Sequence, residues 1–433
     1  MKHNFENKFV GRALIITALY VLGAAFNEVL TGIALLMTLY EILRSDTEHI
    51  FKLELILVPL GGIMYIGGSF SLFNIIQFAT VLVLIMRKVH NISKQVVGFV
   101  LLILLLGAYG IIITGMGNLV DEISFIFEMA VLALILDDID ELDFDGSIRA
   151  FSLGLTLSSV SYLFVDYLPG ITKYVSNAKY RISGSIEKVD RFSGLAGNPN
   201  HYTMAISIAI AGLLVIVICR RMKKRDFLYL GSLIVFGIMS LSKSFFLGLL
   251  FTIGVIIAYM LIRTPGRAIR WTAFIFALFV IVMTVGNFKY LDIILDRVLV
   301  NRGAVDLNTY TSNRLDHYQV YIDAICGSLR IFLFGNGYGT LINGVASHNV
   351  YLEALYYFGI VGISAYLYMI KLIYQSSRNN GQGFLRFMIL FVIIFRGLAI
   401  NMFTSIMFPY YVLIALLMMK SDCSIKLKLS QGG

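Results

Sequence analysis

Charged residues are scarce in this chain, and their scarcity excludes an ordinary soluble protein of this length. Only 14% of the 433 residues are charged, whereas a soluble domain carries about 25%. Hydrophobic residues make up 58% of the chain, and its mean hydropathy is +0.83. Apolar runs recur from one end to the other, and a lipid bilayer is the solvent that accepts them. We therefore expect a single polytopic membrane domain over residues 1–433.

Cysteine is also rare, and its distribution excludes two common kinds of site. Cys219, Cys326 and Cys423 are far apart and form no CxxC motif, so neither a disulfide framework nor a zinc site is indicated. The sequence contains no cluster with metal-ligand spacing, no P-loop and no Ser–His–Asp order. It therefore predicts no metal and no cofactor.

The apolar runs predict an all-α integral membrane protein built as a polytopic helix bundle. A membrane-spanning helix needs roughly 20 apolar residues. The candidate spans are 9–26, 29–43, 53–69, 70–86, 96–115, 122–137, 149–169, 200–219, 227–242, 244–262, 271–289, 347–372, 384–400 and 403–420. Several runs are short, and 53–86 can be divided differently, so we expect about 11–14 transmembrane helices.

The net charge is +9. The basic residues are distributed in the positive-inside pattern of membrane proteins, so we do not read the charge as a sign of a nucleic-acid partner. Lys and Arg occur in short clusters between apolar runs, such as 87–94, 220–225 and 420–428. A cytoplasmic N-terminus and a cytoplasmic C-terminus place these clusters inside. The N-terminal run resembles a signal peptide, but another run follows at once, so we expect an uncleaved first span.

One segment predicted to be inside, 137–145, is acidic instead of basic. Its DxD pairs, Asp138 with Asp140 and Asp143 with Asp145, allow a metal and nucleotide-sugar site. We favour a solvated cytoplasmic loop, because no Gly-rich context holds a nucleotide and acidic residues have little effect on orientation.

Two long loops, 170–198 and 290–346, are predicted at the outer face. Loops longer than about 15 residues are usually functional. Both loops contain several basic residues, although basic residues are disfavoured on the outer side. The first has Lys173, Lys179, Arg181, Lys188 and Arg191, and the second has, around and within it, Lys289, Arg297, Arg302, Arg314 and Arg330. An anionic ligand at the outer face is the simplest explanation.

Each long loop ends where a new helix is predicted to begin. Asn198-Pro199-Asn200 predicts one N-terminus, because Asn is a good N-cap and Pro a good first helical residue. At the second, we expect Ser347 to be the cap, with His348 and Asn349 in the first turn and Glu353 on the same face as Asn349. Helix N-termini and arginines both bind phosphate. Together the two ends predict a pocket for a diphosphate at membrane level.

Each of these signals has a plainer interpretation. Asn-Pro is a common helix start, a histidine beside a helix end can simply be solvated, and Gly335, Gly337 and Gly339 can form an ordinary turn. Arg396 lies inside an apolar span near its outer end. An intramembrane arginine indicates function, although its side chain can also extend to the surface. Lys243, in a tight outer turn, has the same two interpretations.

In combination these residues resemble the O-antigen ligase and polymerase superfamily, of the Wzy type. The resemblance covers about residues 185–365. It rests on five motifs in chain order: Arg191-x-x-Gly194, Asn198-Pro199-Asn200, Ser312-Asn313-Arg314, Gly335-Asn-Gly-Tyr-Gly339, and His348-Asn349-x-Tyr351-Leu352-Glu353 with Gly359-Ile-Val-Gly362.

The resemblance implies a GT-C-like membrane glycosyltransferase in the bacterial cytoplasmic (inner or cell) membrane. Such enzymes act on glycans linked to undecaprenyl diphosphate and join repeat units into a capsule, exopolysaccharide or O-antigen. The donor, the acceptor and the bilayer are the expected partners, with a chain-length regulator and a flippase as further candidates. The alternatives are an O-antigen ligase that transfers a finished glycan and, in another class, a transporter or lipid-linked oligosaccharide flippase.

The expected site has catalytic and substrate-binding members. We expect Arg191 and Arg314 to hold the donor diphosphate and His348 to act on the acceptor hydroxyl. The helix N-terminus should favour its neutral imidazole. Glu353 is the alternative base. The remaining substrate-binding candidates, which would position groups rather than react, are Asn200, Asn349 and Arg396.

Overall fold

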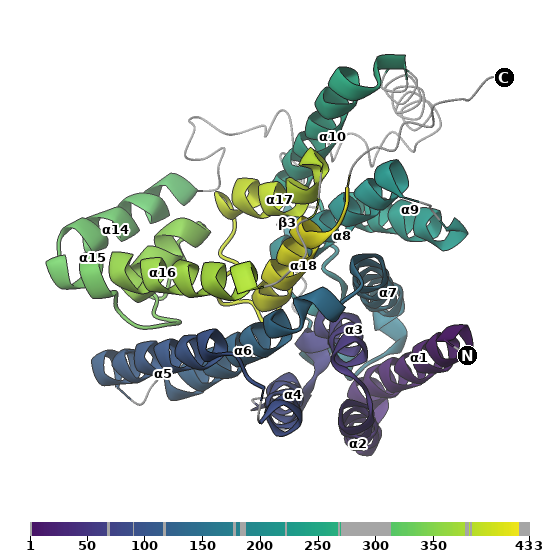
Figure 1. Ribbon diagram of the computed structural model, residues 1–433, viewed down its shortest axis with the longest axis horizontal. Coiled ribbons are helices and arrows are strands. Elements are labelled where there is room, and N and C mark those ends of the chain that lie inside the picture. Colours follow the sequence, from purple (N-terminus) through teal and green to yellow (C-terminus); the bar gives the residue numbers. More distant parts are fainter. Residues whose placement is uncertain are drawn as a thin grey trace.

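The computed structural model describes most of the chain and shows a bundle of helices (Figure 1). The described residues are 2–66, 70–89, 91–115, 118–175, 179–181, 188–220, 223–266, 269, 313–376, 381 and 383–423. The predicted span 271–289 and residues 290–312 of the second outer loop lie outside them. So does Ser312 of the third motif.

The described elements are almost all helical. The α-helices are α1 (Lys2–Phe26), α2 (Glu28–Arg44), α3 (Thr47–Leu57), α4 (Leu72–Lys88), α5 (Lys94–Thr114), α6 (Leu119–Asp137), α7 (Phe144–Leu163), α8 (Pro199–Cys219), α9 (Lys224–Met239), α10 (Lys243–Arg263), α14 (Arg314–Cys326), α15 (Leu329–Phe334), α16 (Val350–Ser376), α17 (Met388–Gly397) and α18 (Phe408–Lys420). The short 3₁₀ helices are Val58–Ile63, Ile139–Glu141, Val165–Tyr167, Ile171–Lys173, Gly194–Ala196 and Phe384–Phe387. Two small antiparallel hairpins pair β1 (Tyr65–Ile66) with β2 (Phe70–Ser71), and β3 (Lys179–Arg181) with β4 (Lys188–Asp190).

Among the described residues, five helices are long and apolar enough to cross a membrane. They are Lys8–Phe26 of α1, Lys94–Thr114, Pro199–Cys219, Lys243–Arg263 and Val350–Gln375 of α16. The chain is therefore a helical, multi-pass membrane protein. The expected total of about 11–14 spans stays a prediction, because the other predicted spans correspond to shorter or more polar helices or lie outside the description.

The predicted span 53–69 is not one helix. The α-helix α3 ends at Leu57, a 3₁₀ helix covers Val58–Ile63, and the chain then enters β1. Pro59 in the first turn of the 3₁₀ helix has no backbone N–H to continue the α-helical pattern. Within the second predicted outer loop, the structure adds two helices, α14 and α15.

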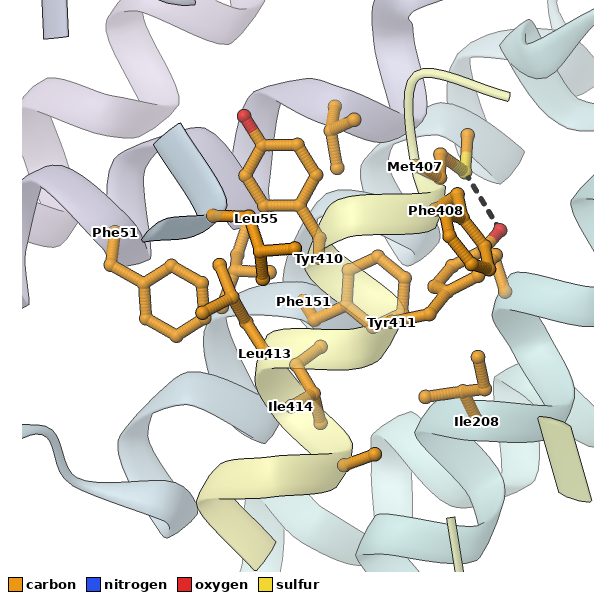
Figure 2. Close-up of a cluster of buried hydrophobic side chains, with 14 of the residues drawn as sticks. Phe51, Leu55, Phe151, Ile208, Met407, Phe408, Tyr410, Tyr411, Leu413 and Ile414 are labelled. Carbon is orange, nitrogen blue, oxygen red and sulfur yellow. Dashed lines mark hydrogen bonds between the residues drawn. The ribbon is translucent and has the colours of Figure 1, made fainter. Parts of the chain in front are cut away.

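The core of the bundle is built around α8 and α18. Of the most apolar window of α8, 83% is buried, against 28% for the windows of α5 and α10. Figure 2 shows α18 with Tyr410 and Tyr411 pointing to different sides, among side chains from α3, α7 and α8. The Tyr411 hydroxyl donates to the Met407 sulfur at 3.2 Å. The most apolar spans thus divide into a buried central helix and helices with outward-facing apolar surfaces.

Charged residues predicted to be cytoplasmic gather at one end of α7, α8 and α9. The Arg149 guanidinium on α7 donates to both carboxylate oxygens of Asp226 at the start of α9, at 2.8 and 3.0 Å. Arg220, just after α8, pairs with Asp145. Lys88 Nζ lies 2.6 Å from Asp138 Oδ1. Lys88 Nζ also lies 3.5 Å from Asp137 Oδ2. Three carboxylates of the acidic segment are therefore held in ion pairs, rather than solvated as expected.

Candidate functional site

The first part of the candidate site is the N-terminus of α8, at the other end of that helix from Arg220. Oδ1 of Asn198 accepts hydrogen bonds from the backbone N–H groups of Asn200 at 2.9 Å and His201 at 3.4 Å. Pro199 takes the first helical position, where no backbone donor is needed. The predicted helix start is confirmed, and Asn198 is its cap.

Arg191 reaches this helix end from the preceding loop. Its Nη2 donates to Oδ1 of Asn200 at 3.2 Å, and its Nε donates to the backbone oxygen of Ser240 at 3.2 Å. Ser240 follows the last residue of α9. The guanidinium thus joins the end of α9 to the start of α8, and the structure brings two predicted site residues, Arg191 and Asn200, together.

From Asn200 the polar contacts continue inward to Arg396. The Ser242 hydroxyl donates to Oδ1 of Asn200 at 3.2 Å and lies 3.0 Å from the Ser244 hydroxyl. Nη2 of Arg396 donates to that Ser244 hydroxyl at 2.9 Å. Arg191 and Arg396 are therefore the two ends of one connected set of amide and hydroxyl groups, which we call the arginine network.

Arg396 lies inside the bundle rather than at its surface. The residue is 1% exposed. Its Nη1 donates to the backbone oxygen of Thr203 and to the Ser207 hydroxyl, both at 2.5 Å, and its Nη2 also donates to the Thr203 hydroxyl at 3.1 Å. Within the described part of the chain, no carboxylate pairs with Arg396, and its Nε has no hydrogen-bond partner. The interpretation that this side chain extends to the surface is therefore wrong.

Arg314 begins α14, directly after Asn313 in the left-handed conformation at φ 60°. Burial lowers the pKa of the Arg314 guanidinium, against a smaller opposite effect of Tyr318. Arg314 is close enough for its charge to act on both His348 and Arg396. The structure therefore gathers three predicted site residues from segments that are far apart in the sequence.

The start of α16 differs from the prediction by two residues. The helix begins at Val350, and Oδ1 of Asn349 accepts from the backbone N–H groups of Tyr351 at 3.0 Å and Leu352 at 3.2 Å. Asn349 is therefore the cap, and the expectation that Ser347 caps a first turn containing His348 and Asn349 is wrong. The Ser347 hydroxyl instead binds the backbone of Asn349 at both its N–H and its carbonyl.

His348 precedes the helix in a left-handed backbone conformation, with φ 55°. This conformation is uncommon for a residue other than glycine and is concentrated at functional sites. The His348 ring packs edge-on against His317, with ring centroids 5.8 Å apart. Burial lowers the pKa of His348, and the charges of Arg314 and His317 lower it further, more than a hydrogen bond with Asn401 raises it. The neutral imidazole is favoured near pH 7.

The two capped helix ends meet at Asn401. Oδ1 of Asn401 lies 3.4 Å from Nε2 of His201, in the first turn of α8. The same residue is close enough to His348, just before α16, to affect its pKa. The expectation that the two helix N-termini lie close together agrees with these contacts.

Asn349 has a structural role in addition to capping. Its Nδ2 lies 3.5 Å from the backbone oxygen of Leu398, which also accepts a hydrogen bond of 2.6 Å from the Tyr318 hydroxyl. Leu398 follows α17 and Tyr318 lies on α14. Asn349 thus helps to hold together α14, the start of α16 and the segment after α17, next to His348.

Glu353 faces a separate cavity of about 410 Å³. The residue is 1% exposed, and its Oε1 accepts a hydrogen bond of 3.0 Å from the Tyr357 hydroxyl. Asn401 also lines this cavity. Glu353 is therefore next to the histidine site through Asn401, in a different compartment from the arginine network.

The glycine motif 335–339 forms a turn against a kink in α16. Gly359 interrupts the helix with φ 61° and ψ 179°. The backbone N–H groups of Asn336 and Gly337 donate to the carbonyls of Tyr356 and Tyr357, at 2.7 and 3.1 Å. A Cβ on Gly335 would meet the Tyr357 oxygen at 2.2 Å. The ordinary-turn interpretation describes this segment well, and its glycines allow close packing.

Sequence reasoning missed the hydroxyl and amide groups that connect the predicted residues. No motif marks them, because serine and threonine are common in helices and their partners are remote in sequence. A weak signal was available in the four-residue spacing of two hydroxyls on α8 and in the Ser-Lys-Ser turn before α10. The missed residues are Thr203, Ser207, Ser242, Ser244, His317 and Asn401.

Comparisons with known proteins add no relative to this description. No family model matches the chain, and no curated protein or solved structure is similar to it.

Proposed function

We propose that this protein is a membrane glycosyltransferase that joins undecaprenyl-diphosphate-linked oligosaccharide repeat units into a surface polysaccharide. The reaction would take place at the outer face of the bacterial cytoplasmic membrane. The observation that carries the proposal is the arginine network, in which a buried arginine is surrounded by hydroxyls instead of carboxylates. The sequence resemblance described above supports the same reaction.

The arginine network suits an anionic ligand. A buried arginine is costly unless an anion compensates it, and the described residues supply no such anion to Arg396. Arg191 and Arg314 bring further positive charge to the same end of the bundle. A guanidinium binds phosphate oxygens through a planar fork of donors. We infer that the donor diphosphate supplies the missing negative charge.

His348 would remove the proton from the acceptor. Its lowered pKa keeps the imidazole neutral and able to accept a proton near pH 7. The acceptor oxygen would bond to the anomeric carbon of the donor as the bond from that carbon to the diphosphate breaks. The electron pair would leave with the diphosphate, whose charge the arginines stabilise. The hydroxyl proton would pass to His348.

The test is deletion of the gene in its native host, followed by gel separation of the surface polysaccharide. We expect the long polymer to disappear while single repeat units are still displayed. Complementation with His348→Ala or Arg314→Ala should fail to restore the polymer at normal protein level. Arg330→Ala is the matched control, because Arg330 contacts Tyr109, Gly335 and Asn336 rather than the arginine network.

Two results would contradict the proposal. Long polymer that forms but stays on its polyprenyl carrier would identify a ligase. Normal polysaccharide in the deletion strain would exclude both reactions and favour a transporter.

A further inference from the structure

The cavity that contains Glu353 has a chemical character opposite to that of the arginine network. Its volume of about 410 Å³ is within the range of roughly 300–1,000 Å³ that ligand pockets occupy. Its lining brings together α4, α6, α16, the glycine-motif turn and the segment after α17. The residues that matter here are Asn74, Glu128, Tyr338, Glu353, Tyr357 and Asn401.

Three of these side chains carry buried acceptor atoms without a partner in the described part of the chain. Oε2 of Glu128, Oε2 of Glu353 and Oδ1 of Asn74 have no hydrogen bond. Glu128 is 2% exposed and Glu353 1% exposed. A buried acceptor without a donor is unfavourable. A ligand rich in hydroxyl donors would relieve this cost at all three positions.

The surroundings favour hydroxyl groups over a metal ion. Among the described residues, the cavity lining includes a third carboxyl group, Asp121, and no lysine, arginine or histidine. Among the described residues, however, no three acidic, histidine or cysteine side chains converge closely enough to hold a metal. The described lining also includes Tyr338 and Tyr357. Polar acceptors together with aromatic side chains suit a sugar, which has hydroxyl edges and apolar ring faces.

Asn401 connects this cavity to the predicted base. It lines the cavity together with Ala346, two residues before His348, lies 3.4 Å from His201, and is close enough to His348 to affect its pKa. A sugar held in the cavity would therefore have one end beside His348. None of the described side chains of the arginine network lines this cavity.

We propose that this cavity binds the acceptor saccharide as an uncharged, hydroxyl-rich chain, with Glu128, Glu353 and Asn74 accepting hydrogen bonds from its hydroxyl groups. The inference rests on the proposed function and specifies its acceptor site. The two substrates are then separated by their chemistry, since the arginines attract the anionic diphosphate, whereas the described lining of the cavity has no basic side chain to hold it. The acceptor oxygen that reaches past Asn401 is the one that His348 deprotonates.

The test measures binding without catalysis. The probe is the repeat-unit oligosaccharide, freed of lipid and phosphate by partial hydrolysis of the host polysaccharide and added to purified protein in nanodiscs. We expect Glu128→Leu and Asn74→Leu, which remove the acceptor atoms, each to weaken binding about tenfold, the effect of losing one good hydrogen bond to a buried acceptor. Glu54→Leu is the matched control, because Glu54 is equally buried but bonds to Thr80 and Tyr410.

The outcomes separate this inference from the proposed function. Equal saccharide binding by all variants would overturn the cavity assignment, as would a response of the cavity to Na⁺ or Mg²⁺ with no saccharide binding. If deletion abolishes polymer and both cavity variants restore it fully, the cavity assignment fails while the polymerase stands. If deletion leaves the polysaccharide unchanged, the polymerase fails whatever the binding result.

Discussion

Two buried arginines, at different ends of α8 and α9, have different kinds of partner. Arg149 is 8% exposed and forms a two-bonded ion pair with Asp226, at 2.8 and 3.0 Å. Arg396 is 1% exposed, and within the described chain its hydrogen bonds go only to hydroxyls and one carbonyl, on Thr203, Ser207 and Ser244. Both guanidiniums are removed from water, but only the first has a compensating charge within the described chain.

The difference separates a structural arginine from one that is ready for a ligand. A guanidinium already paired to a carboxylate has little attraction left for a phosphate, because its charge is compensated. Hydroxyls can orient a guanidinium without cancelling its charge. The arrangement around Arg396 therefore retains the positive potential that a diphosphate would need.

The largest expected effect is on stability, at the paired arginine. Arg149→Met leaves Asp226 buried without its cation, and breaking such a pair destabilises a protein by about 3–5 kcal/mol. Thermal unfolding in detergent should show a clear loss. Adding Asp226→Asn should recover most of it, because Asn removes the charge and can still accept the Lys223 N–H bond that Asp226 accepts at 2.9 Å. A double variant no more stable than the single one would argue against this reason.

The second effect is on activity, at the arginine without a carboxylate. Arg396→Met should lower polymerisation in isolated membranes by about 100- to 1,000-fold, as loss of one charged transition-state donor does. Its stability should be unchanged or raised, because the buried charge has been removed. If Arg396→Met unfolds as readily as Arg149→Met, the two arginines have the same role and the contrast between them is wrong.

The third prediction concerns a variant that adds the carboxylate that the arginine network lacks. Asn200→Asp places a negative charge between Arg191 and Ser242 at nearly constant volume. It should repel the diphosphate and reduce activity roughly tenfold to hundredfold, without loss of stability. Asn200→Ser, which keeps a neutral acceptor, should have a smaller effect. The comparison is read from initial rates of polymer formation, and equal rates for both variants would contradict a charge effect.

The smallest effect is on pH dependence and tests His348. The groups that act on its pKa are Arg314, His317, His201 and Asn401. Because the pKa is lowered and the neutral form is the base, activity should persist above the lowered pKa and fall only as the pH drops through it, below 6.5. Arg314→Gln removes a repelling charge, so the acid limb of kcat/KM should move to higher pH by up to about one unit. An unchanged acid limb would shift the assignment toward Glu353.

Much of the helical architecture could be predicted, because apolar run length is a local property. The starts of α8 and α10 agree with the predicted spans to within one residue. The error at 53–69 has a local cause that was visible in Pro59, but the apolar composition of Leu60 and Ile63 concealed it. Residues of one hydrophobic run can belong to different elements, and composition alone does not divide them.

The sequence identified the candidate residues beside helix starts and missed the polar groups that connect them. Arg191, Asn200, Arg314 and His348 stand beside recognisable helix starts, so motif spacing identified them. Ser242, Ser244 and Asn401 became visible only when four separate segments packed together. The burial of the Arg396 side chain could not be predicted from the sequence either, because the direction of a side chain depends on the neighbouring helices. The cap of α16 was misassigned since Ser347 and Asn349 are both good caps.

The most direct test of the account measures how tightly undecaprenyl diphosphate binds to purified protein in nanodiscs. Three proteins are compared: the wild type, Arg396→Met and the Arg149→Met/Asp226→Asn double variant. The double variant is the matched control, because it also loses a buried arginine. We predict that wild type and the double variant bind equally, and that Arg396→Met binds at least about tenfold more weakly, as expected for loss of a charged hydrogen bond. Equal binding by Arg396→Met and wild type would contradict the claim that the arginine network is the anion site.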